Sequence, residues 1–308
     1  VTVTDAEGWG YITVYPCGSR PNASSLNYEA GSTIANAVVA PLSSDGRLCF
    51  YSYSPVHLIA DVNGTLLDGN GFEALAPTRL FDTRTGEGGV AASPVSGSYI
   101  LEVPVNGRAG VPSSGVGAVV MNVTATDTSG RGYVTVFPCG TLPNSSNINF
   151  TPNETVPNAV VAPLSSSGSV CFYVFGSAHL IADVTGYFTA NVGFVPLSPT
   201  RLEDSRNYGT FGVVGNDAGT GAPLRVTVLG RAGIPSTNVA AVSLNVTAIG
   251  ANTRVGGYVT VYPCGEPPNA SNINFVADEV VPNAVIAPVS SSGEVCVFVY
   301  GRAHVLVD

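Results

Sequence analysis

The sequence has no lysine and no glutamine among its 308 residues, and charged residues make up only 11% of it. All 12 positive charges are therefore arginines, which excludes chemistry that needs a lysine, such as a Schiff base or the phosphate-binding lysine of a P-loop. The net charge is −9. Because binding to a phosphate backbone needs clustered cations, nucleic acid and other acidic partners are not expected.

Long apolar runs are also missing. No stretch of about 18 apolar residues is present, so no membrane-spanning helix is expected. The start, Val1–Asp5, has neither the basic nor the apolar region of a signal peptide, and we expect any export signal to have been removed. With 36 Gly, 22 Pro, 13 Tyr and 12 Phe, and with many Val and Thr, the composition instead favours strands joined by tight turns.

One segment occurs three times with small changes. The string Gly-Tyr-[Ile/Val]-Thr-Val-[Tyr/Phe]-Pro-Cys-Gly stands at residues 10–18, 132–140 and 257–265, which gives a repeat length of about 122 residues. A second string, Pro-Thr-Arg-Leu-x-Asp-[Thr/Ser]-Arg, occurs at residues 77–84 and 199–206. The chain is therefore predicted to be an array of similar units.

The phase of these strings predicts the domain organisation. Residues 1–70 form the C-terminal part of a first unit, 71–190 a complete second unit, and 191–308 a third unit that ends just short of its last strand. A complete unit has about eight short strand-like runs separated by turn residues, which is typical of an all-β sandwich and here of a jelly-roll-like one. The run 159–162, Ala-Val-Val-Ala, is apolar on both faces and predicts a central strand.

The cysteines also follow the repeat. They fall in pairs that are about 32 residues apart each time, and this recurrence favours one disulfide inside each unit. A metal site or a redox dithiol is the alternative, but there is no Cys-x-x-Cys and only one His in each unit. Disulfides would place the protein outside the cytoplasm. The predicted pairs are Cys17 with Cys49, Cys139 with Cys171, and Cys264 with Cys296.

A His-x-x-x-Asp string recurs in every unit. On a strand its two residues share a face about 13 Å apart, which is too far for a direct acid-base pair. We interpret each His as bonding a neighbouring strand or lining a shared groove, and each Asp as beginning the turn before the next unit; a ligand role is the weaker alternative. The residues are His57 and Asp61, His179 and Asp183, and His304 and Asp308.

An aspartate flanked by two arginines recurs in the connecting stretch. Such a group can close a network of charge-assisted hydrogen bonds that ties a long connection to the sandwich. The alternative is a site for an anionic sugar or another carboxylate. The residues are Arg79, Asp82 and Arg84 in the second unit, and Arg201, Asp204 and Arg206 in the third.

Asparagines near aromatic residues suggest a carbohydrate-binding surface. Asparagine beside proline is, however, first a device of turns and edge strands, and Trp9 is the only tryptophan in the chain. The residues considered are Asn147, Asn149 and Asn158 with their counterparts Asn272, Asn274 and Asn283, and the aromatics Tyr133, Phe137 and Phe150.

Signatures of catalysis are missing from the sequence. It has no Gly-x-Ser-x-Gly and no His-Glu-x-x-His, and no free thiol if the cysteines pair. Each His takes the same place in its unit, whereas an active site normally occurs once in a chain. We therefore expect no enzyme and no cofactor or metal.

Several strings occur in a fixed order along the chain: Pro-Thr-Arg-Leu-x-Asp-[Thr/Ser]-Arg, Gly-Arg-Ala-Gly-[Val/Ile]-Pro, Asn-Val-Thr-Ala, the Cys-containing repeat, and His-[Leu/Val]-[Ile/Leu]-[Ala/Val]-Asp. Together they resemble a module found in tandem in secreted and cell-surface proteins of actinobacteria. The resemblance covers essentially the whole chain. It implies an extracellular β-rich repeat, sometimes attached to hydrolases, and it offers no catalytic residues to carry over.

The expected function is that of a non-enzymatic extracellular structural protein that forms a cell-surface array, sheath or filament. A surface with few charges can pack extensively without desolvating many ions. The expected partners are neighbouring repeats or subunits. A carbohydrate- or cell-wall-binding module attached to a larger secreted protein is the alternative, with cell-wall polysaccharide as its partner.

The alignment of the units carries a further expectation. Val1 corresponds to Val123 and Val246, so the first unit lacks the front part that the second unit has at 71–122. An incomplete sandwich exposes strand edges and apolar faces. We expect either preceding residues or a neighbouring subunit to supply the missing part, and the units to follow one another end to end with contacts mainly between neighbours.

Overall fold

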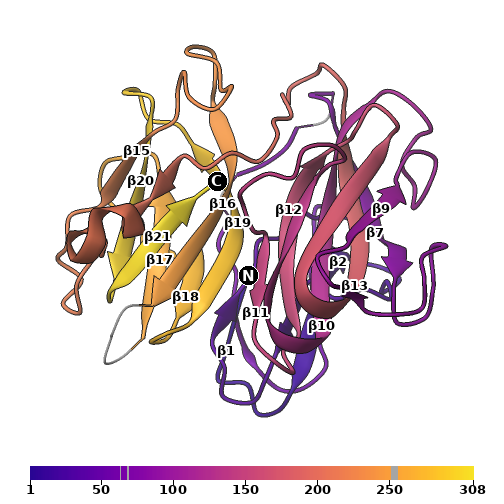
Figure 1. The fold of residues 1–308 in the computed structure, drawn as a ribbon, viewed down its shortest axis with the longest axis horizontal. Helices are drawn as coiled ribbons and strands as arrows, with labels where there is room; N and C mark the ends of the chain where they lie inside the picture. Colours follow the sequence, from indigo (N-terminus) through magenta and orange to yellow (C-terminus); the bar gives the residue numbers. More distant parts are fainter. Residues whose placement is uncertain (63, 68, 251–255) are drawn as a thin grey trace.

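The computed structural model describes residues 1–62, 64–67, 69–250 and 256–308, and the regular secondary structure in these ranges is almost entirely β-strand (Figure 1). In this part of the chain the single helical element is a 3-10 helix, η1 (Ser205–Gly212). The prediction of an all-β protein is confirmed, and its cause is a composition rich in Val, Thr and Tyr, which fit a pleated surface. No helix in the described ranges is long and apolar enough to cross a membrane.

The third unit consists of two four-stranded antiparallel sheets. One sheet has the order β14-β21-β16-β19 and the other β15-β20-β17-β18. Their inner faces share one core, because valines alternate with polar or half-exposed residues along the strands, as Val259 and Val261 do on either side of Thr260. The strands are β14 (Glu203–Asp204), β15 (Leu224–Thr227), β16 (Ala241–Gly250), β17 (Gly257–Tyr262), β18 (Ile273–Phe275), β19 (Val280–Pro288), β20 (Glu294–Tyr300) and β21 (Ala303–Val307).

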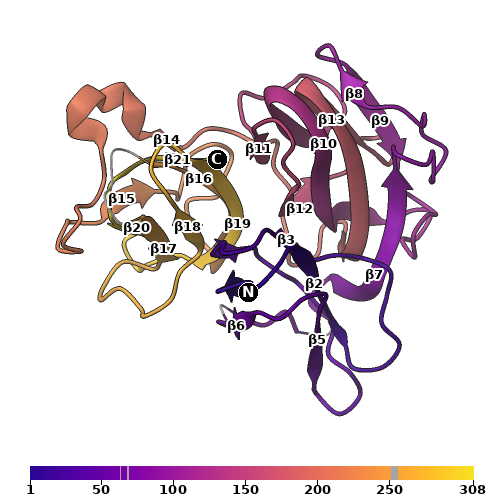
Figure 2. The same cartoon turned by 90° about the horizontal axis from the view of Figure 1, so that it is seen from below.

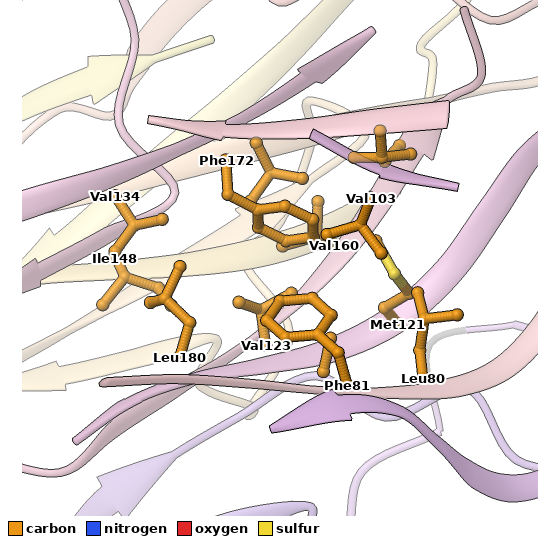
Figure 3. Packing of buried hydrophobic residues seen from close by; sticks show 14 of the residues in the cluster. Leu80, Phe81, Val103, Met121, Val123, Val134, Ile148, Val160, Phe172 and Leu180 are labelled. Carbon is orange, nitrogen blue, oxygen red and sulfur yellow. The ribbon is translucent and has the colours of Figure 1, made fainter. Parts of the chain in front are cut away.

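The second unit is organised around two long strands. β10 (Val116–Pro138) and β13 (Ser169–Thr189) pair along their length, and register shifts near Thr126 and Ser129 interrupt the ladder. The core lies between β10, β13 and the strands that join them, and Phe81 meets Phe172 edge to face at 5.0 Å (Figure 3). The other strands are β7 (Phe72–Asp82), β8 (Val95–Ser96), β9 (Ile100–Pro104), β11 (Ile148–Phe150) and β12 (Val156–Pro163).

The first unit has two three-stranded sheets and a smaller core. The sheets have the orders β4-β1-β6 and β3-β2-β5. Six side chains, among them Val3, Ile12 and Leu26, form the buried cluster. In the described part of this unit nothing corresponds to β7, β8 or β9. Its strands are β1 (Thr2–Thr4), β2 (Gly10–Pro16), β3 (Leu26–Tyr28), β4 (Ile34–Ala35), β5 (Leu48–Ser52) and β6 (His57–Ile59).

The prediction of a central strand at 159–162 is wrong. These residues lie in β12, which pairs only with β10 and is therefore an edge strand in its sheet. Its outer side is nevertheless covered, because Val161 packs with Val39 of the first unit against a small cluster that contains Phe188. Val160 packs in the main core of the second unit and Val161 against this second cluster, which explains the apolar pattern on both faces.

The three units meet around a common centre (Figure 2). The first unit lies beside both other units, at the bottom of this view, and Ala37 of the first unit donates a hydrogen bond from its backbone to Asn283 of the third. The expectation of a row with contacts mainly between sequence neighbours therefore does not describe this chain. The arrangement is a triangle in which the first and third units also touch.

Candidate functional site

Each unit holds one disulfide. The six cysteines pair as predicted, with Cα–Cα distances of 4.9, 5.0 and 4.8 Å, and none is free. In the second unit Cys139 follows β10 directly and Cys171 lies in β13, so the bond links two strands that are already paired. The sulfur atoms are therefore not available as free thiolates.

The arginine-flanked aspartate of the second unit is part of a larger ion network. Asp82 accepts hydrogen bonds from Arg79 at 3.1 Å and from Arg84 at 2.7 Å. Arg79 also binds Asp183, with Nε 2.6 Å from Oδ1. Both carboxylates are almost fully buried, so the sequence-distant Asp183 belongs to this network. The two strings that were interpreted separately therefore form one cluster.

The third unit builds the same cluster. Arg201 bridges Asp204 and Asp308, and Arg206 donates to Asp204 at 2.6 Å. Burial raises the pKa of Asp308, and the hydrogen bonds from Arg201 offset only part of this shift. The hydrogen bond from Arg206 lowers the pKa of Asp204. Within each cluster the arginines and aspartates pair with one another, which favours the structural interpretation over an anion site.

The pKa values in the second unit follow the same division. Burial raises the pKa of Asp183, and the hydrogen bonds from Arg79 offset it only in part. Burial also acts on Asp82, but the hydrogen bonds from Arg84 outweigh it and lower the pKa of Asp82. In each cluster the aspartate of the His-x-x-x-Asp string is thus harder to ionise than the aspartate that two arginines flank.

The histidines bond the connecting stretch and not the aspartates four residues later. His179 Nδ1 lies 3.1 Å from the hydroxyl of Thr83, and His304 Nδ1 lies 3.4 Å from that of Ser205. His57 is exposed. The expectation that each Asp begins a turn is wrong for Asp183, which lies inside β13, because that strand continues to Thr189 and pairs there with β7.

Asp204→Ala is expected to lower the free energy of unfolding at pH 7 by about 1 to 2 kcal/mol, because two guanidinium groups lose a partner while Arg206 is half exposed and screened. The folded-state pKa of Asp204 is lowered, so its contribution is present above the ordinary aspartate pKa of about 3.9 and is lost as the pH falls below it. Chemical denaturation of both proteins between pH 7 and pH 3 measures this.

Asp45→Ala is the matched control, since the Asp45–Arg47 pair lies on the surface and both side chains are more than half exposed. Its effect on unfolding is expected to be close to zero. A difference between wild type and Asp204→Ala that stayed constant down to pH 3 would contradict the ionic origin of the effect.

Asparagine side chains form hydrogen bonds that connect segments within a unit. Asn147 Oδ1 accepts the backbone N–H of Val136 at 2.7 Å, and the side chain of Asn158 donates to the carbonyl oxygen of Asn147 at 2.7 Å. Asn158 is completely buried. These residues therefore do not offer a polar edge to a ligand, as a carbohydrate surface would require.

The same asparagines join the second unit to the third. Asn158 donates to Asn245 Oδ1 at 3.0 Å and accepts the backbone N–H of Ala284 at 3.1 Å. Asn245 in turn donates to the carbonyl oxygen of Ser146 at 2.7 Å. We call this set of bonds the asparagine junction.

An equal junction joins the first unit to the second. Asn36 donates to Asn122 Oδ1 at 3.0 Å and accepts the N–H of Ala159 at 3.2 Å, while Asn122 donates to Ser24 at 2.7 Å. The third unit completes the circle with the bond from Ala37 to Asn283 Oδ1 at 3.1 Å. Each unit thus gives an asparagine oxygen to a backbone N–H of the next one in a cyclic order.

The aromatic residues considered for carbohydrate binding are mostly core residues. Phe137 and Phe150 are almost fully buried, and of the three only Tyr133 is half exposed. Tyr133 instead stacks on Phe175, which is 50% exposed, at 5.4 Å. The alternation of the strand indicated that Tyr133 and Phe137 share a face, but it could not show that this face is covered at Phe137.

A row of aromatic rings covers the outer face of β2 and β5. Trp9 stacks on Tyr53 at 4.9 Å, Tyr53 on Tyr11 at 5.7 Å, and the guanidinium of Arg20 lies 3.8 Å from the ring centre of Tyr51. In the sequence, only the alternation of Tyr11 with apolar residues indicates an outward-facing ring. The rings that stack with Tyr11 come from residues about 40 positions later, so the row itself could not be predicted.

Comparison with known proteins does not assign the chain to a family. No protein family matches the sequence, and no curated protein matches it significantly. Within the described residues the one grouping of potential metal ligands is Glu102 with Cys139 and Cys171, whose sulfur atoms form the disulfide.

Proposed function

We propose that this protein is a non-enzymatic extracellular structural protein, whose β units pack on one another to build a surface array or filament. The observation that carries the proposal is the cyclic set of asparagine junctions. In these junctions buried side chains such as Asn36 and Asn158 form hydrogen bonds between units. Buried polar groups that are fully bonded make such contacts specific.

The use of the chemically versatile side chains supports the same function. The histidines of the second and third units bond hydroxyl groups, and the buried aspartates bond arginines. A catalytic group needs a free lone pair or proton near a substrate, whereas these groups are occupied in holding strands together. Three disulfides support an extracellular location, because such bonds persist in oxidising compartments.

A second candidate is binding of cell-wall polysaccharide, and one observation favours it. Trp9 is 61% exposed at the end of the aromatic row and keeps one ring face free of Tyr53. Aromatic side chains with a polar edge suit sugar rings, which have both apolar and hydroxyl faces. The candidate ranks second because the other rings of the row stack mainly on one another.

Electron microscopy of the native cell surface, with antibodies against this protein, tests the proposal. We expect the label to follow ordered fibres or sheets, and the purified protein to form oligomers in sedimentation velocity as its concentration rises. A monodisperse monomer together with diffuse labelling would contradict it. Co-sedimentation with insoluble wall polysaccharide without oligomer formation would favour the second candidate.

A further inference from the structure

The outer face of one sheet in the second unit carries large apolar side chains. Tyr133 of β10 lies opposite Phe175 of β13, so both rings stand on the same face of the sheet. Tyr173, two residues before Phe175, shares this face with its own partner on β9, Ile100. Phe175 is 50% exposed and Ile100 is 40% exposed. We call this surface the aromatic face; its residues are Ile100, Tyr133, Tyr173 and Phe175.

The exposure of this face does not come from a missing strand. The second unit has β7, β8 and β9 paired with β13, and β9 itself contributes Ile100 to the face. On the opposite side of the same strand, Phe172 and Val174 are fully buried in the core. The rings therefore lie on the outside of a closed sandwich. A sheet side that meets water is ordinarily polar, and neighbouring exposed apolar side chains mark an interaction site.

The third unit has the same arrangement of rings. Tyr258 stacks on Tyr300 with ring centres 5.3 Å apart, and Phe298 lies tilted beside Tyr258 at 6.3 Å. The corresponding distances in the second unit are 5.4 and 5.9 Å. Three outward rings in the same geometry are thus a feature of the repeat.

Two charged residues lie at opposite ends of the aromatic face. Glu102 of β9 lies beside Cys171, which pairs with Phe137, and Arg131 lies six residues before Phe137 on β10. The two charges are therefore about 20 Å apart along the strands, with the rings between them. Both side chains are exposed, and neither forms an ion pair with any residue that the structure describes.

The aromatic face of the third unit has a different charge pattern. Arg225 takes the place of Glu102 beside the corresponding cysteine, and it pairs with Glu294 of its own unit. Gly256 stands at the position of Arg131 in the repeat. An acidic and a basic end on one face are therefore particular to the second unit.

A second copy of this chain matches such a face. In an isologous contact a two-fold axis through the centre of the face exchanges its two ends. Arg131 of each copy would then face Glu102 of the other, and the rings would pack between these two ion pairs. Because each copy has a net charge of −9, two copies repel one another unless the contact is uncharged or complementary. A neutral saccharide would leave both charges without a partner.

We propose that the aromatic face of the second unit joins two copies of this protein in an isologous contact, in which Arg131 and Glu102 set the register of the rings. Tyrosine and phenylalanine suit this role because aromatic residues are enriched in the centres of protein interfaces. The proposal rests on the structural function proposed above and names one contact of the array.

Sedimentation velocity of the whole 308-residue protein tests the contact. We expect a monomer–dimer equilibrium in which the dimer fraction grows up to about 100 μM, as for a small interface. Phe175→Asp changes an exposed side chain, so this variant is expected to fold and to remain monomeric. Val195→Asp is the matched control, because Val195 is 65% exposed and lies in the third unit, and it should associate like wild type.

Charge reversal gives a readout that a loss of folding cannot imitate. Arg131→Glu would place two carboxylates against each other twice in each dimer, and it is expected to raise the dissociation constant at least about tenfold. Glu102→Arg is expected to have the same effect through facing guanidinium groups. The double variant restores opposite charges across the axis, so its dissociation constant should return to within about threefold of wild type.

Three results would overturn the proposal. They are a protein that stays monomeric at about 100 μM, association that Phe175→Asp leaves unchanged, and a double variant that associates as weakly as the single ones. A monomer whose co-sedimentation with wall polysaccharide depends on Phe175 would assign the face to a saccharide instead.

The contact and the proposed function can fail separately. Any of these results, obtained while ordered fibres are present on cells, would refute the contact and leave the structural function in place. A dimer with the expected response to charge reversal, in the absence of fibres on cells, would support the contact and refute only the proposed function.

Discussion

Asp183→Ala is expected to lower the free energy of unfolding by about 3 to 5 kcal/mol, because it leaves the largely buried guanidinium of Arg79 without one of its two carboxylate partners. Arg79 is only 17% exposed and the side chain of Asp183 is 3% exposed. The remaining bond to Asp82 keeps the effect at the lower end of that range. Urea unfolding followed by circular dichroism measures the change.

Asp61→Ala provides the matched control. Asp61 holds the corresponding position in the first unit but is exposed there, without an arginine among the described residues. Its replacement is expected to change the free energy of unfolding by less than about 0.5 kcal/mol. Equal effects of Asp183→Ala and Asp61→Ala would show that the arginine contact contributes nothing to stability.

Asn158→Ala is expected to lower the free energy of unfolding by about 2 to 3 kcal/mol, because one buried and two partly buried groups lose their partner at once. These are the carbonyl oxygen of Asn147, the side-chain oxygen of Asn245 and the backbone N–H of Ala284. An unsatisfied buried polar group costs about 1 to 3 kcal/mol. Thermal unfolding measures the loss, and faster hydrogen exchange at Ala284 locates it at the contact between the second and third units.

Two further variants calibrate this result. Asn283→Ala removes only the bonds to Ala37 and Asn272, so its cost should be smaller than that of Asn158→Ala. Asn144→Ala changes an exposed residue of a turn and should be neutral. If Asn158→Ala exchanged like wild type at Ala284, the asparagine would not be what holds the two units together.

The strand content and the disulfides could be predicted from the sequence, because both depend on residue patterns that are visible along the chain. Alternation of valine with polar residues specifies a strand wherever it occurs, and turn residues end it. The cysteine pairs could be assigned because the same spacing returned three times, as in Cys139 and Cys171. None of these inferences needed the position of one unit relative to another.

The ion clusters were accessible only in part. The arginines flanking Asp82 are close in sequence, so their network could be inferred from local geometry. Asp183 joins it from 104 residues beyond Arg79, and alternation assigned it only to a face of a strand. The contact depends on β7 pairing with β13, which is a choice among many strand pairings with similar patterns.

The sequence by itself determines the strand-rich structure, the disulfide pairs and the low charge, because each of these depends on local segments or on composition. The triangle of units and the asparagine junctions between them arise only from folding in three dimensions. An asparagine such as Asn158 has the same pattern whether its amide bonds its own unit or the next, and Phe50 has the same pattern as Phe172. Their different surroundings come from which strands lie over them, because burial is a property of the packed chain and not of the residue.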